Sequence, residues 1–238
     1  MDAFSLEACG PDNSSNEKSV SAMKQKKPQV AGIILAAGSS SRMGRPKQLL
    51  AFQGKTILDQ VVFNALQSEL TQVIVVLGHA APTIQKQVDF SAVHVVVNND
   101  YAVGQSSSLK KGVAAVADCC EGAMFLLGDQ PLVGHETINE LIHVFRSALS
   151  PIVIPFCKGK RGNPVIIHRD LFPQIDSLTG DVGARLLFDR YKESIMAVEV
   201  EDTGILFDVD TWKDFKELQL LHSLRRSSCE KIKTGDTP

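Results

Sequence analysis

The fold is indicated by one stretch of the sequence, Val30-Ala31-Gly32-Ile33-Ile34-Leu35-Ala36-Ala37-Gly38-Ser39-Ser40-Ser41-Arg42-Met43-Gly44-Arg45-Pro46-Lys47. Its first five residues are apolar and rich in β-branched side chains, which predicts a short buried parallel strand. The Gly/Ser-rich turn that follows lets backbone N–H groups approach an anion closely, because glycine carries no Cβ. Arg42 and Lys47 add the positive charge that such a turn lacks alone. We therefore predict that residues 37–47, here called the phosphate loop, hold a triphosphate.

Two other phosphate-binding patterns do not fit this loop. The Walker pattern requires Gly-Lys-Ser/Thr at a helix start, whereas Lys47 stands between Pro46 and Gln48. The dinucleotide fingerprint requires three glycines at fixed spacing, which Gly38 and Gly44 do not supply. An ordinary surface turn with solvated cations is the remaining alternative. The density of glycines, hydroxyls and cations favours phosphate binding.

The composition is that of an ordinary globular protein. The 238 residues are 44% hydrophobic and 22% charged, which favours a single domain with one good core. A net charge of -2 offers no basic field for nucleic acid or a membrane surface. The five cysteines include no C-x-x-C pair, so neither a zinc site nor a disulfide framework is predicted. With no signal-peptide core and no membrane-length apolar run, we expect a cytoplasmic location.

The chain divides into three parts. Residues 1–29 are polar and without periodicity, and we expect a disordered leader there; residues 223–238 are expected to form a flexible tail. Between them, residues 30–222 alternate apolar strands with amphipathic helices, one of them beginning at an N-cap on Thr56. This pattern predicts an α/β domain, doubly wound, with a mostly parallel sheet and helices on both faces. In such sheets the ligand binds at the carboxyl ends of the strands.

Acidic residues follow the strand predicted at 123–127 and recur near the C-terminus. Asp129, in Gly128-Asp129-Gln130-Pro131, could face the triphosphate and bind Mg²⁺, or could accept backbone N–H groups in its turn. Asp208 and Asp210 alternate along an extended segment, which places both carboxylates on one side. Either Asp210 or Thr211 could instead cap the last helix. Three carboxylates would make an oxygen-rich site suited to Mg²⁺.

Three further motifs are candidates for binding the second substrate. Residues 104–109 open a helix with hydroxyl groups, so Gln105 and its neighbours could meet a ligand, or Ser106 could simply be the N-cap. The basic turn 160–164 suits an anionic acceptor, with an exposed hairpin turn as the alternative. Residues 179–185 look like the start of a helix over 181–190 that could present N–H groups and Arg185 to a phosphate. The alternative is that Asp181 simply caps that helix and Arg185 pairs with a nearby acid. The histidines form no set, and no nucleophilic triad emerges.

The ordered motifs resemble those of the molybdenum cofactor cytidylyltransferase-like proteins, within the nucleotidyltransferase superfamily. They are Leu-Ala-Ala-Gly, Gly-Gln-Ser-x-Ser, Gly-Asp-Gln-Pro, Arg-Gly-Asn-Pro, Gly-Asp-x-Gly-Ala-Arg and Asp-x-Asp-Thr. The guanylyltransferase members usually carry glycine where this chain has Ala37. The family's last motif usually continues Asp-Thr-Pro-Glu-Asp, whereas here Thr211 is followed by Trp212-Lys213-Asp214.

The resemblance implies a nucleotide-diphospho-sugar transferase-like, Rossmann-type fold and transfer of CMP from CTP to the phosphate of molybdopterin or molybdenum cofactor. It implies Mg²⁺ as cofactor and a molybdenum hydroxylase as a possible recipient of the product. The residues it assigns to catalysis are Arg42, Lys47 and Asp129, and those it assigns to the metal are Asp129, Asp208 and Asp210. It assigns nucleotide binding to Leu35, Ala36, Ala37, Gly38, Ser39, Ser40, Arg42, Lys47, Gly78, Asn99, Ser106 and Gly128. It assigns acceptor binding to Gln105, Ser108, Arg161, Gly162, Asn163, Asp181 and Arg185.

Overall fold

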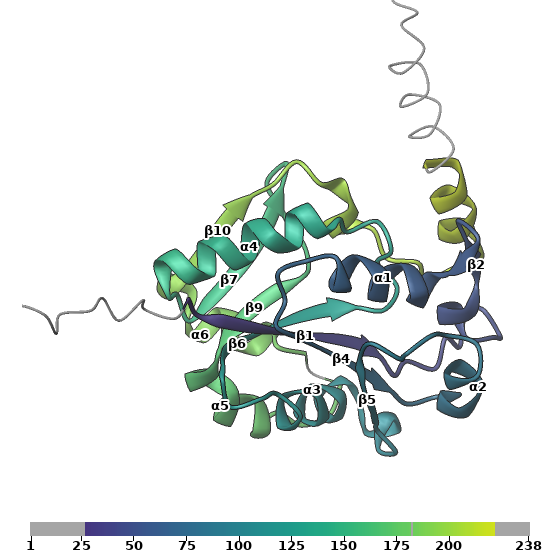
Figure 1. Cartoon of the computed structure of the whole chain (residues 1–238), viewed down its shortest axis with the longest axis horizontal. Helices are drawn as coiled ribbons and strands as arrows, with labels where there is room; N and C mark the ends of the chain where they lie inside the picture. Colours follow the sequence, from purple (N-terminus) through teal and green to yellow (C-terminus); the bar gives the residue numbers. More distant parts are fainter. Residues whose placement is uncertain (1–26, 182, 222–238) are drawn as a thin grey trace, which may run out of the picture.

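One twisted sheet with helices on both faces makes up most of the computed structural model, which describes residues 27–181 and 183–221 (Figure 1). The strand order is β10-β7-β9-β6-β1-β4-β5, with β8 paired to β7. β1 pairs in parallel with both β4 and β6, whereas β9 runs antiparallel to β6 and β7. The prediction of a mostly parallel sheet is therefore confirmed. The strands are β1 (Gln29–Ala36), β4 (Gln72–Leu77), β5 (His94–Val97), β6 (Cys120–Leu127), β7 (Ile152–Cys157), β8 (Lys160–Arg161), β9 (Val165–His168) and β10 (Ile195–Glu199).

The helices cover the two faces of the sheet in separate sets (Figure 1). On one face, α1, α2 and α4 contribute to a core that includes Ile34 of β1. On the other face, α3, α5 and α6 pack around Ile33. Successive side chains of a strand point to opposite faces, so a strand buried on both sides must be apolar throughout. The helices are α1 (Ile57–Leu66), α2 (Ala81–Gln85), α3 (Gln105–Ala114), α4 (His135–Ala148), α5 (Phe172–Asp176) and α6 (Arg185–Arg190).

A third, smaller core joins the phosphate loop to residues 209–218, here called the C-terminal segment. It contains Met43 of the loop, Phe52 of the hairpin formed by β2 (Ala51–Phe52) and β3 (Lys55–Thr56), and Val209 and Leu218. Residues 212–221 are helical, and this last helix lies beside β2 in Figure 1. The C-terminal segment is thus packed against the loop that follows β1.

One helix start agrees with the sequence prediction and another differs from it. The cap on Thr56 is confirmed, because its hydroxyl accepts from Asp59 N while the Asp59 carboxylate accepts from Thr56 N. The helix predicted from Asp181 begins only at Arg185. Asp181 instead accepts a hydrogen bond from the backbone N–H of Gln105, at the start of α3.

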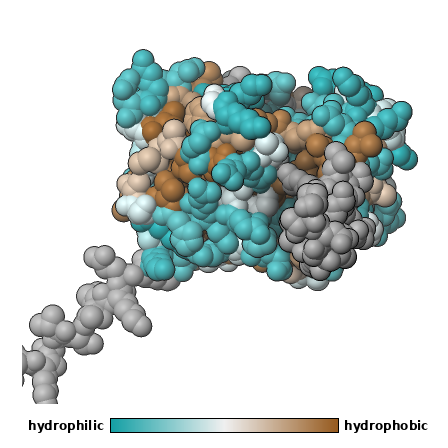
Figure 2. Space-filling view, turned by 90° about the horizontal axis from the view of Figure 1, so that it is seen from above, coloured by the Kyte–Doolittle hydropathy of each residue, from teal (hydrophilic) through white to brown (hydrophobic). Residues whose placement is uncertain are grey.

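The expected leader and tail lie almost wholly outside the described residues, and β1 already begins at Gln29, the last residue of that leader. Among the residues described, no helix is both long and apolar enough to cross a membrane. Hydrophilic residues cover much of the face seen in Figure 2, with hydrophobic ones visible in patches between them.

Candidate active site

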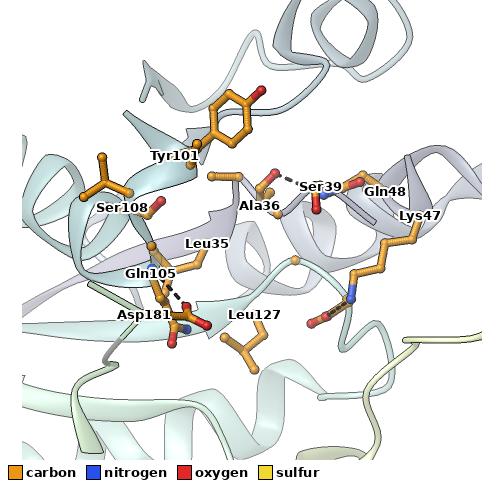
Figure 3. Close-up of a pocket in the computed structure, with 17 residues that line it drawn as sticks. Leu35, Ala36, Ser39, Lys47, Gln48, Tyr101, Gln105, Ser108, Leu127 and Asp181 are labelled. Atoms are coloured by element: carbon orange, nitrogen blue, oxygen red, sulfur yellow. Dashed lines mark hydrogen bonds and ion pairs between the residues drawn. The ribbon is translucent and has the colours of Figure 1, made fainter. Parts of the chain in front are cut away.

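A cavity of about 630 Å³ lies where β1 and β6 end (Figure 3). The two strands are parallel neighbours, with Leu35 opposite Leu127, so the turns that follow them meet at one edge of the sheet. The first turn carries the phosphate loop and the second carries Gly128 and Asp129. The predicted residues that line this cavity are Leu35, Ala36, Ala37, Gly38, Ser39, Lys47, Gln105, Ser108, Gly128, Asp129 and Asp181.

Side chains within the phosphate loop fix its shape. The backbone N–H of Lys47 donates to the Ser40 hydroxyl at 3.1 Å, and Ser40 has a positive φ of 52°. The buried Gln48 donates from Nε2 to the carbonyl of Ala36 at 3.1 Å. Ser40 therefore has an internal role in the loop, and Gln48 is a lining residue that the sequence motifs did not indicate.

Gly78 and Asn99 lie outside the lining of the cavity. A Cβ on Gly78 would stand 2.8 Å from the Cβ of Ala37, so the glycine permits β4 to end directly behind the phosphate loop. Asn99 is exposed, whereas its neighbour Asn98 is fully buried. Asn98 Nδ2 donates to the Ser108 hydroxyl at 3.0 Å, so this amide holds a serine that lines the cavity.

The charged centre of the site is the ammonium group of Lys47. Its Nζ lies 2.5 Å from Asp129 Oδ2 and 2.7 Å from Asp210 Oδ1. Arg42, at the exposed rim, contacts the other oxygen of Asp210 at 3.3 Å. Burial lowers the pKa of Lys47, but the two carboxylates outweigh it and the pKa is raised. The hydrogen bond from Lys47 in turn lowers the pKa of Asp210.

Asp208 has a different partner from Asp210. It accepts a hydrogen bond from Gln130 Nε2 at 2.7 Å, and its pKa is raised by burial and by the charge of Asp129. The three acids have the hard oxygen donors that Mg²⁺ prefers. Across residues 27–181 and 183–221, however, no group of three His, Cys, Asp or Glu side chains forms a ready metal site. Asp129 and Asp210 can bind a divalent cation only when the Lys47 ammonium no longer pairs with them.

A second cavity of about 310 Å³ adjoins the first, and Leu35, Gln105, Leu127 and Asp181 line both. It gathers the predicted acceptor residues Arg161, Gly162, Asn163 and Arg185. The pKa of Arg161 is lowered by burial and by the nearby charge of Arg185. Neither guanidinium forms an ion pair with any residue that the structure describes. Two close, unpaired cations favour an anionic ligand.

The start of α3 is fixed by residues 180 and 181. Both the N–H and the hydroxyl of Ser106 donate to the carbonyl of Gly180, at 3.3 and 2.7 Å. Ser106 is therefore buried away from the cavity and is not the N-cap, which is Gly104. The Gly104 φ is 124°, and a Cβ there would stand 2.4 Å from Gly180, so only glycine fits.

A cavity at the carboxyl ends of parallel strands, with a glycine-rich loop and a lysine paired to acids, suits nucleotidyl transfer, and comparisons with known proteins show that the chain is a nucleotidyltransferase of the nucleotide-diphospho-sugar transferase fold. More narrowly, the chain belongs to the family of MobA-like NTP transferase domains, whose model matches residues 32–195.

Named relatives span several activities. The chain is 31% identical to nicotine blue oxidoreductase of Paenarthrobacter nicotinovorans, over 77% of this chain and 93% of that one. It is 32% identical to molybdenum cofactor cytidylyltransferase of Escherichia coli, over 77% and 92%. A solved structure of Rv0371c from Mycobacterium tuberculosis, a complex with manganese, superposes with a TM-score of 0.71 at 31% identity, covering 80% and 98%.

Replacing Lys47 by methionine is expected to raise the pKa of Asp210, because the hydrogen bond and charge that lower it are removed. The pair contributes stability above pH 3.8, the ordinary pKa of Asp210, and below pH 10.5, that of Lys47. The stability advantage of the parent over Lys47→Met should shrink outside that window. Carboxyl ¹³C NMR titration and urea unfolding at several pH values measure the two effects.

Lys55→Met is the matched control, since Lys55 Nζ lies over the Phe63 ring and contacts neither carboxylate. An Asp210 pKa that is unchanged in Lys47→Met would contradict this account of the charged centre.

Proposed function

We propose that this protein transfers CMP from CTP to the phosphate of molybdopterin or molybdenum cofactor and releases pyrophosphate. The observation that carries the proposal is the pair of adjoining cavities. One has the phosphate loop with Lys47 and Asp129, and the other has the unpaired Arg161 and Arg185. A triphosphate and a phosphorylated acceptor bound side by side would place the acceptor phosphate near the α-phosphorus.

In this reaction an oxygen of the acceptor phosphate forms a bond to the α-phosphorus of CTP. The bond from that phosphorus to the bridging oxygen of the β-phosphate breaks, and pyrophosphate leaves with the electron pair. A phosphate monoester is largely ionised near neutral pH, so no side chain needs to remove a proton. Lys47 and Arg42 stabilise the negative charge that develops on the phosphoryl oxygens and the leaving group.

A divalent cation would add to this stabilisation. Asp129 and Asp210 would hold it, with Asp208 nearby, and Mg²⁺ is the choice that best suits three carboxylates. That the related Rv0371c has been solved as a complex with manganese supports the use of a divalent metal. The remaining contribution of the protein is to position the two substrates, which needs rigid loops rather than reactive side chains.

Two other activities share parts of the site. A nucleotidyltransferase for another phosphorylated acceptor would use the same triphosphate cavity with a different second ligand. A carrier that delivers molybdenum cofactor without transferring a nucleotide would not need Lys47 and Asp129 beside a triphosphate cavity. One relative is named an oxidoreductase, but this sequence has no dinucleotide fingerprint that would support such an activity.

Pyrophosphate release is expected with CTP and Mg²⁺, and only when molybdenum cofactor is present. The four nucleoside triphosphates, each with and without the acceptor, are compared in a coupled pyrophosphate assay. Release with GTP alone would change the base assignment and keep the chemistry. Acceptor binding without release from any nucleotide would favour the carrier. Asp129→Ala is the control: it should abolish turnover while acceptor binding survives.

Ala37→Gly is expected to loosen the preference for CTP. Ala37 lines the triphosphate cavity, and glycine at this position is typical of the molybdenum cofactor guanylyltransferases. The measurement is the ratio of kcat/KM for CTP to that for GTP in the parent and the variant. An unchanged ratio would show that the choice of base is made elsewhere in the cavity.

Arg161→Met is expected to raise KM for the acceptor by roughly 10- to 100-fold, the loss typical of one hydrogen bond to a charged group. KM for CTP should change little, because Arg161 lines only the second cavity. Arg190→Met is a matched control, since Arg190 ends α6 and lies over the Tyr191 ring. An equal rise in both KM values would contradict the division of labour between the cavities.

A further inference from the structure

The C-terminal segment 209–218 contacts the phosphate loop in three chemically different ways. Asp210 accepts from the two loop cations, Arg42 and Lys47. Met43 packs in the small core with Val209, Phe215 and Leu218. The guanidinium of Arg45 lies over the ring of Trp212, with 4.6 Å from its central carbon to the ring centroid.

Only the first of these contacts uses groups needed for the triphosphate. When phosphates take Arg42 and Lys47 as partners, Asp210 loses the ion pairs that now anchor it to the loop. The apolar packing of Met43 and the stacking of Arg45 involve no phosphate-binding group, so both persist. The hydrogen bond from Val209 N to the carbonyl of Asp129 then still holds the C-terminal segment to the turn after β6, and these two contacts hold it to the phosphate loop itself.

Trp212 is not required for the local helix start. Thr211 and Asp214 form the cap there, because Asp214 Oδ2 accepts from Thr211 N at 2.7 Å and Thr211 Oγ1 accepts from Asp214 N at 3.3 Å. The first helical position after such a cap suits proline as well as any residue. The Trp212 ring nevertheless stays 40% exposed, packed edge-on against Phe215 with Arg45 across it. Trp212 therefore joins Arg45 of the phosphate loop to Phe215 of the small core.

We propose that Trp212 is a positioning residue for the phosphate loop. Its ring holds Arg45 and so retains the C-terminal segment on the loop while Asp210 exchanges Arg42 and Lys47 for the ligands of the active site. This inference rests on the proposed binding of a triphosphate, and not on the identity of the base or the acceptor.

Trp212→Ala and Arg45→Met are each expected to weaken binding of inorganic tripolyphosphate and of CTP, with Mg²⁺, by about two- to five-fold, the size of one exposed cation–π contact. The double variant should bind as weakly as either single one, because both remove the same contact. Trp212→Phe should restore most of the affinity, since phenylalanine keeps an aromatic face for Arg45. Isothermal titration of the full chain gives the dissociation constants.

A second readout comes from fluorescence, because Trp212 is the chain's single tryptophan. Binding of tripolyphosphate should change its emission in the parent, and the change should shrink in Arg45→Met. Phe63→Ala is the matched control: Phe63 is 42% exposed and lies under a cation, Lys55, at 3.8 Å. The Phe63→Ala variant should bind tripolyphosphate and CTP with the dissociation constants of the parent.

Additive losses in the double variant, or parent-like binding by Trp212→Ala, would overturn the inference. Failure of the parent to bind tripolyphosphate would overturn it together with the proposed function. If the parent binds tripolyphosphate and releases pyrophosphate from CTP while the Trp212 variants match it, the inference alone fails.

Discussion

The ammonium of Lys47, held between Asp129 and Asp210, is the interaction on which the arrangement of the site depends. It joins three segments that are far apart in the sequence: the phosphate loop, the turn after β6 and the C-terminal segment. Without a cation at this point, neighbouring carboxylates would repel; the charge of Asp129 is also a cause, after burial, of the raised pKa of Asp208. The lysine therefore neutralises the two carboxylates, as a bound cation would.

The sheet makes this meeting possible. β1 and β6 are parallel and adjacent, and the N–H of Gly128 donates to the carbonyl of Leu35 at 2.9 Å, which aligns the two turns. A main-chain hydrogen bond also joins the turn after β6 to the C-terminal segment: Val209 N donates to the carbonyl of Asp129 at 3.1 Å. Asp210 thus reaches Lys47 through main-chain pairing, which a single side-chain substitution leaves in place.

What could be predicted from the sequence follows from local physics. A β-branched run followed by glycine and serine predicts a strand and an anion-binding turn, and both the parallel sheet and the Thr56 cap are confirmed. Long-range contacts escaped prediction. Asp181 looked like a cap for its own helix but accepts a hydrogen bond from the first residue of α3. Of the two neighbouring asparagines, Asn98 is the buried one, whereas Asn99 was the predicted site residue. No local pattern reveals which of two neighbouring polar residues points inward.

The same long-range contact links the two cavities. Gln105 and Asp181 line both of them, and the backbone of Gln105 donates to Asp181 at 3.3 Å (Figure 3). The segment that carries Asp181 continues to Arg185, while the helix that begins at Gln105 carries Ser108 into the first cavity. A displacement of this wall by one ligand would therefore move residues that face the other. The two cavities therefore share a wall, which is held at the start of α3 by the hydrogen bond from the Ser106 hydroxyl to the carbonyl of Gly180.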